Sequence, residues 1–219
     1  MTRNQNQWIK LYEGLDALWI HDGNPRRPHA LLASLKHSNG FFNSRLVIPD
    51  DGLMRDAASD LLELLAAEPD GQCYIESTRG VVGPQTGATK LAELLHRKLV
   101  GLSSKPKPSF WASPSKGEVD GKKVMILDNK DLALFPKQNI LLCEDVLTTG
   151  GSVDLTANAV IGAGGIIQPF VLALVNRSGF TELNGRKIIA LINHPMPTWT
   201  ADECPSVSRA LKLSLQKSL

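Results

Sequence analysis

Apolar side chains recur every three or four residues in several segments of the chain, which is the spacing of an amphipathic helix. The first helix is predicted over residues of about 4–20, from Trp8, Leu11, Tyr12, Leu15, Leu18 and Trp19. The stretch 50–70 predicts a second helix that stops near Pro69, because proline cannot continue a helix. "HALLASLK" (29–36) is compatible with a short helix, residues 80–101 read as a glycine-rich loop that leads into a helix, and 151–165 predict a helix closed by glycines.

Short apolar runs rich in β-branched and aromatic residues lie between these helices and predict strands. They are found at about 40–49, 73–77, 109–112, 122–127, 139–145, 168–176 and 186–193. A mobile loop is expected after the 109–112 strand, because residues 101–118 hold three Pro, five Ser and three Lys. The tail is rich in Pro and Ser before a short, basic, helix-like end. Alternating strands and helices predict an α/β fold with a mainly parallel central sheet flanked by helices.

Composition narrows the class of protein. The chain has 219 residues, of which 42% are hydrophobic and 21% charged, as expected for one soluble globular domain over residues 1–219. A net charge of +2 gives no argument for a nucleic-acid or membrane partner, and we expect neither. The three cysteines are widely separated and form no disulfide framework, which indicates a reducing compartment. The polar start lacks the apolar core of a signal peptide, so we expect a cytoplasmic protein.

The stretch "NILLCEDVLTTGGSV" (139–153) carries the strongest chemical signal. In a parallel α/β sheet, ligands bind beyond the carboxyl ends of the strands, so Glu144 and Asp145 emerge where a ligand binds. The segment 148–152 then offers backbone amides and three hydroxyls at a helix N-terminus, which suits a phosphate. The two carboxylates suit neutral hydroxyls, because they would repel the phosphate itself. A phosphate beside a vicinal diol describes a ribose 5-phosphate.

This stretch resembles the motif of type I phosphoribosyltransferases that binds phosphoribosyl pyrophosphate (PRPP). The resemblance implies that the PRPP site includes Glu144, Asp145, Val146, Leu147, Thr148, Thr149, Gly150, Gly151 and Ser152. Glu144 and Asp145 would hold the ribose hydroxyls, and 148–152 would hold the 5-phosphate. The alternative is a strand with solvated acids and a capped helix. It is the weaker interpretation, because one cap needs one hydroxyl rather than three with two glycines.

Other segments resemble the orotate branch of this family. "VVGPQTGATKLAELL" resembles its pyrophosphate loop, which would place Thr86 and the amides around Gly87 on the pyrophosphate. "LKHSNGFFN", "LALVNRSG" and "PTWTADECP" resemble the segments that surround the base. The implied base contacts are Arg177, Thr148, Lys36, Phe41 and Phe42. Residues 1–48 with about 190–219 would then form a small hood over the base site, and 50–189 would form the core.

The mobile loop departs from the family pattern. It commonly carries an Arg-Lys-x-x-Lys-x-His string that closes over PRPP, whereas this chain has "ASPSKGEVDGKK". Lys116 falls where the second lysine would be, and the arginine, the first lysine and the histidine have no counterpart. Lys116, with Lys122 or Lys123, therefore does the work of the loop, or catalysis is weak, or the substrate differs.

The resemblance implies transfer of a ribose 5-phosphate from PRPP to a base, with orotate favoured. Mg²⁺ would bridge pyrophosphate and ribose oxygens without a certain protein ligand. Asp145, Glu144 and Lys116 are the candidate catalytic residues. A homodimer, with each loop serving the neighbouring site, is also implied. Two other functions stay open: transfer to a purine or another pyrimidine, and a non-catalytic PRPP-binding regulator.

Each single residue also has a structural interpretation. Arg177 is also compatible with an arginine on the surface, and Lys116 with a solvated lysine in a loop. Phe41 and Phe42 are also compatible with positions in the core. His37 is interpreted as a polar rim residue rather than a catalyst. His21, His29, His96 and His194 show no spacing, to each other or to the cysteines, that is typical of a metal site.

Overall fold

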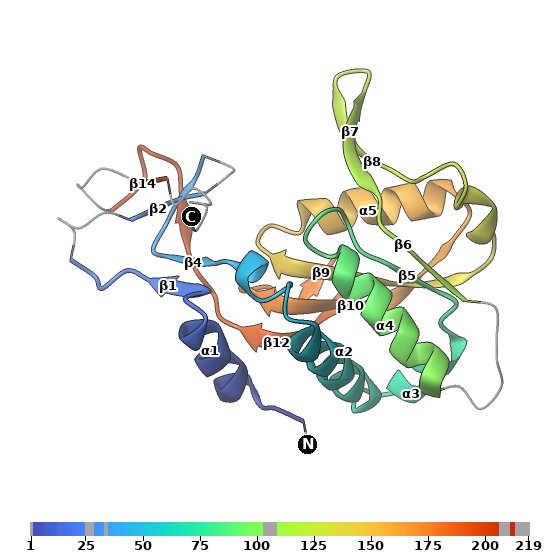
Figure 1. The fold of residues 1–219 in the computed structure, drawn as a ribbon. Helices are drawn as coiled ribbons and strands as arrows, with labels where there is room; N and C mark the ends of the chain where they lie inside the picture. The colour runs from blue at the N-terminus through green and yellow to red at the C-terminus, as the bar shows by residue number, and fades with distance from the viewer. Residues whose placement is uncertain (1, 25–28, 33–34, 103–108, 206–210, 213–219) are drawn as a thin grey trace.

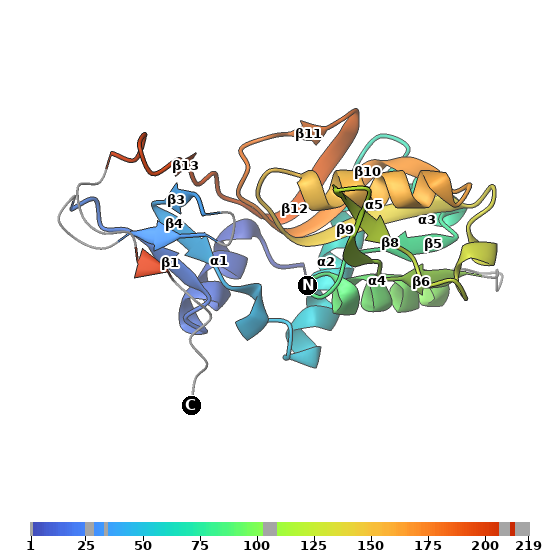
Figure 2. The same ribbon diagram turned by 90° about the horizontal axis from the view of Figure 1, so that it is seen from above.

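The computed structural model describes residues 2–24, 29–32, 35–102, 109–205 and 211–212. Its largest element is a six-stranded sheet in the order β11-β12-β10-β9-β5-β6 (Figures 1 and 2). Neighbouring strands run parallel except β11, which pairs antiparallel with β12 at one edge. The strands are β5 (Gly80–Val82), β6 (Phe110–Ala112), β9 (Asn139–Leu147), β10 (Ile166–Asn176), β11 (Glu182–Leu183) and β12 (Arg186–Asn193).

The order of the parallel strands creates one switch point. From β5 the chain goes outward to β6, and it then returns to the other side of β5 to build β9, β10 and β12. The connections therefore diverge between β5 and β9. In open α/β sheets the ligand crevice lies at such a point, beyond the carboxyl ends of the strands.

Helices cover both faces of the sheet, because its parallel strands carry apolar side chains on both faces. On one face, α2 (Asp51–Ala66) and α4 (Thr89–Leu102) pack against the strands, and α5 (Gly151–Gly162) covers the other face (Figure 1). Neighbouring residues of one strand alternate between the two cores: Leu141 and Cys143 contribute to the first, and Leu142 to the second. The predicted α/β fold with a mainly parallel sheet is confirmed.

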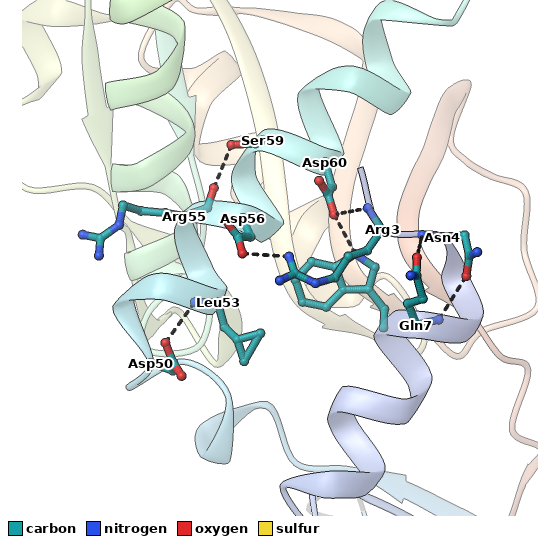
Figure 3. Close-up of polar contacts among 10 residues, drawn as sticks. Arg3, Asn4, Gln7, Asp50, Leu53, Arg55, Asp56, Ser59 and Asp60 are labelled. Carbon is teal, nitrogen blue, oxygen red and sulfur yellow. Dashed lines mark hydrogen bonds and ion pairs between the residues drawn. The ribbon is translucent and has the colours of Figure 1, made fainter. Parts of the chain in front are cut away.

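The N-terminal helix is fixed to this core by polar contacts. Helix α1 (Gln5–Gly14) begins with a capping box, in which the Asn4 side chain accepts from the Gln7 amide while the Gln7 side chain accepts from the Asn4 amide (Figure 3). The buried carboxylate of Asp60 on α2 accepts from the Trp8 indole at 2.9 Å and from the Arg3 amide at 3.1 Å. These contacts attach α1 to α2, so α1 belongs to the core packing.

Two small sheets, which we call the hood sheets, lie at the far end of the molecule from α4 (Figures 1 and 2). The first pairs β1 (Leu18–Ile20) with β4 (Gly40–Phe42). The second has the order β13-β3-β2-β14 and joins segments from both ends of the chain. Its strands are β2 (Ala30–Leu31), β3 (His37–Ser38), β13 (Thr198–Trp199) and β14 (Leu211–Lys212).

Several predicted elements have other boundaries or another type. The first helix ends at Gly14 rather than near residue 20, because Asp16 has a left-handed φ of 53° and the chain turns into β1. Residues 30–31 form a strand rather than a short helix. The predicted strand at 40–49 ends at Phe42 and continues as a 3-10 helix, Ser44–Leu46. The predicted strand at 73–77 is helix α3 (Gly71–Ser77).

The segment predicted as a mobile loop is a β-hairpin. β7 (Ser115–Val119) pairs antiparallel with β8 (Lys122–Ile126), and the hairpin projects from the core in Figure 1. Its turn contains Asp120 and Gly121, both at positive φ, which is the two-residue turn that fits the twist of a hairpin. The predicted strand at 122–127 corresponds to β8, and that at 109–112 to β6. Of the predicted helix-like tail, Leu211 and Lys212 form a strand and the remainder lies outside the described residues.

Among the described residues, no helix combines the length and the apolar character that crossing a membrane requires.

Candidate active site

A cavity of about 320 Å³ opens at the switch point, beyond the carboxyl ends of β5 and β9. Its walls come from four sources: the loop after β5, the end of β9 with the start of α5, the hairpin, and the 3-10 helix Ser44–Leu46. The lining residues are Arg45, Pro84, Gln85, Thr86, Gly87, Lys116, Glu144, Asp145, Val146 and Ser152. Six of the eleven residues predicted for PRPP line this cavity, from separate segments of the sequence, whereas Leu147 is 1% exposed and packs in the core.

The acidic pair occupies the inner wall of this cavity. Glu144 is only 6% exposed, and one of its carboxylate oxygens accepts a hydrogen bond from the Asp145 amide at 3.1 Å. Burial raises the pKa of Glu144 well above its ordinary value, and the charge of Asp145 raises it further, while the Lys116 ammonium acts in the opposite direction. The two carboxyls thus have different environments, and Asp145, half-buried, is the one more open to the cavity.

The loop after β5 is held close to Asp145. A Cβ atom at Gly87 would lie 2.3 Å from Asp145 Oδ2, so only glycine allows the backbone to pass there. The loop is also attached to the segment before the hairpin. The Gln85 amide donates to the Pro114 carbonyl at 2.9 Å, and the Ser113 hydroxyl donates to the Gly83 carbonyl at 2.8 Å. These bonds leave the exposed Thr86 at the mouth of the cavity.

The N-terminus of α5 forms the third wall. Gly150 precedes the helix at φ 82°, a conformation that favours glycine, and a Cβ there would meet the Leu183 side chain at 2.5 Å. No side chain of the described residues caps this helix, so its first amides are available to an anion. Ser152 lines the cavity, while Thr148 is half-buried and Thr149 exposed in the bend before the helix.

Two cations border the cavity. Lys116 reaches it from β7 and was predicted from its position in the sequence. Arg45, in the 3-10 helix Ser44–Leu46, was not predicted, because a single arginine in an apolar stretch carries no local signal. Both are suited to the phosphate groups of a polyanionic ligand.

Arg177 lies beside the cavity, directly after β10. Its amide donates to the Leu147 carbonyl at 2.9 Å, which places it next to the end of β9. The residue is only 3% exposed, and its guanidinium donates to the Ser38 hydroxyl of β3 at 2.6 Å. Among the described residues no carboxylate pairs with Arg177, and its Nε is buried without a partner. Burial lowers the pKa of Arg177 to about 10, so the side chain is still a cation at pH 7.

The remaining candidates for the base site differ in burial and in their neighbours. Phe42 is 3% exposed and packs against Tyr12 with ring centroids 5.7 Å apart, so it belongs to the core. Phe41 is half-buried on the neighbouring position of β4 and stays a candidate. Lys36 is exposed in the turn before β3, and its charge acts on Glu203 rather than on a residue of the cavity wall. The alternation of β4 therefore separates Phe41 from Phe42, which are adjacent in sequence.

Solved structures share this architecture. Orotate phosphoribosyltransferase from Aeropyrum pernix superposes with a TM-score of 0.60 at 21% identity, covering 84% of this chain and 91% of that one. Adenine phosphoribosyltransferase from Rhodothermus marinus gives a TM-score of 0.57 at 16% identity, covering 85% and 98%. The fold is that of the type I phosphoribosyltransferases.

Sequence comparison gives the branch within this class. Orotate phosphoribosyltransferase from Heliobacterium modesticaldum is 32% identical over 205 residues, which is 92% of each chain. The enzyme of the same name from Acidithiobacillus ferrooxidans is 31% identical over 189 residues, 86% of this chain and 88% of its own. No protein-family model matches the chain. The chain belongs to the orotate phosphoribosyltransferase family, as its motifs predicted.

Proposed function

We infer that the protein transfers the ribose 5-phosphate of PRPP to orotate, giving orotidine 5'-phosphate and pyrophosphate, a reaction of pyrimidine nucleotide biosynthesis. Its relatives bear the name of this activity. The structural observation that supports orotate as the base is the environment of Arg177. This cation is buried and has no carboxylate partner among the described residues. A buried charge without a counter-ion is costly, so the site is suited to an anionic ligand.

The base would be held by charge and shape. The carboxylate of orotate accepts two parallel hydrogen bonds from a guanidinium, a geometry that lysine cannot reproduce. Ser38 fixes one nitrogen of Arg177 at 2.6 Å and leaves the buried Nε available. Phe41, half-buried on β4, would offer an aromatic face, and Thr148, half-buried after β9, would offer a hydroxyl. A purine has no carboxylate, so it would leave the guanidinium unpaired.

The acidic pair would act on the sugar. In the reaction the bond from the ribose carbon to pyrophosphate breaks, and a ring nitrogen of the base forms the new bond to that carbon. Positive charge develops on the ribose in the transition state, and fixed carboxylates close to it stabilise this charge. Asp145 and Glu144 would accept hydrogen bonds from the ribose hydroxyls, while the amides of 151–152 would bind the 5-phosphate.

Mg²⁺ fits the chemistry of the cavity. The wall offers carboxylate oxygens from Asp145 and Glu144, the ligand type that Mg²⁺ prefers, and PRPP brings phosphate oxygens. When bound, the ion neutralises charge on the leaving pyrophosphate. Lys116 and Arg45 would add to this neutralisation from the protein, and Lys116, on the hairpin, would help exclude water from the ribose carbon.

The choice of base is tested by turnover with a panel. Wild-type protein, PRPP and Mg²⁺ are incubated with orotate, uracil, adenine or hypoxanthine, and pyrophosphate release is measured. We expect release with orotate. Turnover only with another base contradicts the substrate assignment, and PRPP binding without turnover on any base would favour the regulator.

A variant of Arg177 tests the same assignment at one residue. Arg177→Gln should raise KM for orotate by about a hundredfold, since it removes a charged hydrogen-bonding pair, and should leave KM for PRPP unchanged. Arg79→Gln is the matched control, because Arg79 lies at the amino end of β5 and its guanidinium donates to the Glu76 and Thr78 carbonyls. An unchanged KM for orotate in Arg177→Gln would mean that Arg177 does not bind the base.

A homodimer belongs to the same proposal. The family resemblance implies that the loop of one subunit serves the site of its neighbour, whereas in the single chain Lys116 lines its own cavity. Mixing Lys116→Met with Asp145→Asn subunits separates these arrangements. Shared sites would regain activity in the mixed dimer, because one of its two sites would combine an intact Lys116 with an intact Asp145. Self-contained sites would regain none.

A further inference from the structure

Three potential metal ligands meet between the strands of the second hood sheet, away from the residues assigned to PRPP. His29 precedes β2, His37 begins β3, and Cys204 follows β13. Their ligand atoms all lie within 4.8 Å of one another. His29 Nε2 is 2.8 Å from His37 Nδ1 and 3.3 Å from Cys204 Sγ. These residues are 8 and 175 positions apart in the sequence, which is why their spacing along the chain gave no metal signal.

The distances fit one shared ion after a small movement. Ligands at about 2.0 Å for nitrogen and about 2.3 Å for sulfur in tetrahedral geometry lie about 3.3–3.6 Å from each other. The two observed separations, 2.8 and 3.3 Å, are a few tenths of an ångström shorter. His29 Nε2 makes both of these contacts, so it lies between the other two ligand atoms.

The burial of His29 selects the ring nitrogen that faces the cluster. His29 is 3% exposed, and its other ring nitrogen, Nδ1, is buried without a partner in the described part of the chain, so Nε2 is the atom with neighbours. Neutral imidazole and thiolate are the ligand forms that a metal requires.

We propose that His29, His37 and Cys204 bind a thiophilic divalent cation of the Zn²⁺ class. Two imidazoles and one thiolate suit zinc and exclude magnesium, which takes oxygen ligands. Among the described residues the group has only these three side-chain ligands, so a water would complete tetrahedral coordination. This site is separate from the Mg²⁺ of the proposed reaction and does not depend on it.

The ion would connect the hood to the base site. It joins three segments whose strands have only two residues each. His37 is followed by Ser38, whose hydroxyl lies 2.6 Å from the Arg177 guanidinium and also donates to the Pro197 carbonyl at 2.9 Å. Holding His37 therefore holds the hydroxyl that orients Arg177. The ion is a positioning device, since it touches none of the residues assigned to PRPP.

The test uses metal binding as its readout, so it is independent of turnover. Full-length, untagged protein is stripped with a chelator, dialysed and titrated with Co²⁺, and bound zinc in the protein as purified is counted by mass spectrometry. We expect one cobalt per chain, with a thiolate-to-metal charge-transfer band and the intense visible bands of a tetrahedral ion. Zn²⁺ should displace Co²⁺ and raise Tm, because it binds the native state.

Variants assign the ligands. Cys204→Ser should lose the charge-transfer band and weaken Co²⁺ binding by about tenfold or more, and His37→Gln should weaken it similarly while the thiolate remains. Cys73→Ser is the matched control, since Cys73 is an exposed thiol on α3, and it should behave as wild type.

Three results would overturn the proposal. They are wild-type protein without the charge-transfer band at saturating Co²⁺, an unchanged band in Cys204→Ser, and an unchanged affinity of His37→Gln for Co²⁺. Tm of each variant without metal separates lost binding from lost folding, and His37→Gln is the test of the site if Cys204→Ser does not fold.

Discussion

The cavity and the hood sheets differ in what holds them in place. Most cavity residues lie at the ends of strands of a six-stranded sheet whose β9 and β10 are nine and eleven residues long and buried on both faces. The hood strands have two or three residues each, and they meet the core through single side chains, such as Phe42 against Tyr12 and Ser38 with Arg177. The part that would bind the sugar phosphate is thus built on the large sheet, while the part that would bind the base depends on a few side chains.

This difference predicts two kinds of kinetic defect. A substitution at the cavity should lower kcat with every base, because the transition state of the sugar is common to all of them. A substitution in the hood should change KM for the base and leave PRPP binding intact. The following predictions are arranged from the largest expected effect to the smallest.

Asp145→Asn should have the largest effect. It keeps the shape of the side chain but removes the charge that would stabilise the cation-like ribose, so kcat should fall by about 10²–10³-fold. Steady-state kinetics of pyrophosphate release measures this. Asp128→Asn is the control, because Asp128 is an exposed carboxylate paired with Lys130 at 3.1 Å. Equal activity of the two variants would remove Asp145 from the catalytic residues.

Lys116→Met should lower kcat by about tenfold to a hundredfold, because one cation facing the pyrophosphate is lost. Lys122→Met is the matched control on the same hairpin. Lys116 pairs with Met125 and Lys122 with Val119, and the alternation of the strands puts the two lysines on opposite faces. A comparable loss in both variants would show that the charge of the hairpin acts as a whole, rather than Lys116 at the cavity.

Ser38→Ala tests the hood with a smaller change. It removes the hydroxyl that fixes the Arg177 guanidinium, so KM for orotate should rise by about tenfold while KM for PRPP stays constant. Both constants come from the same pyrophosphate assay. Ser59→Ala is a suitable control, because the Ser59 hydroxyl donates to the Arg55 carbonyl within α2. A fall in kcat with an unchanged KM for orotate would contradict the division between cavity and hood.

Glu144→Gln should change stability with pH rather than only activity. Burial raises the pKa of Glu144 in the folded state above its ordinary value of 4.5, so the folded protein binds this proton more strongly than the unfolded chain. The free energy of unfolding therefore falls as the pH rises from about 4.5 through the folded pKa. The glutamine variant lacks this dependence, so its Tm should exceed that of wild type by a margin that grows over this window. Thermal melts at several pH values without PRPP measure it, and a lower Tm at pH 8 would contradict the predicted sign.

The segments that were correctly predicted carry their information locally. The stretch 139–153 combines a buried strand, the acidic pair and the glycine turn without interruption, and the structure has β9 and α5 there. The helix at 51–66 and the strands β10 and β12 also follow from long, regular patterns. A segment of eight to sixteen residues with one consistent pattern leaves few alternatives.

The errors fall on short segments that depend on distant partners. α3 has seven residues, too few for a helical period to be distinguished from a strand. β7 was predicted as part of a loop because this exposed strand is polar and contains a glycine, and its pairing partner β8 lies across a turn. Arg45 and the cluster of His29, His37 and Cys204 depend on contacts between strands, which no local pattern records.

The pairing of the second hood sheet also sets an order of assembly during synthesis. β3 pairs with β13, and β2 pairs with β14. In both pairs the second strand lies more than 150 residues later in the chain. Every strand of the large sheet, and every residue of the cavity, is made before residues 198–212. The segments of the cavity can therefore emerge from the ribosome first, since they end at Ser152. The sheet beside Arg177 closes only after residues 198–212 have been made.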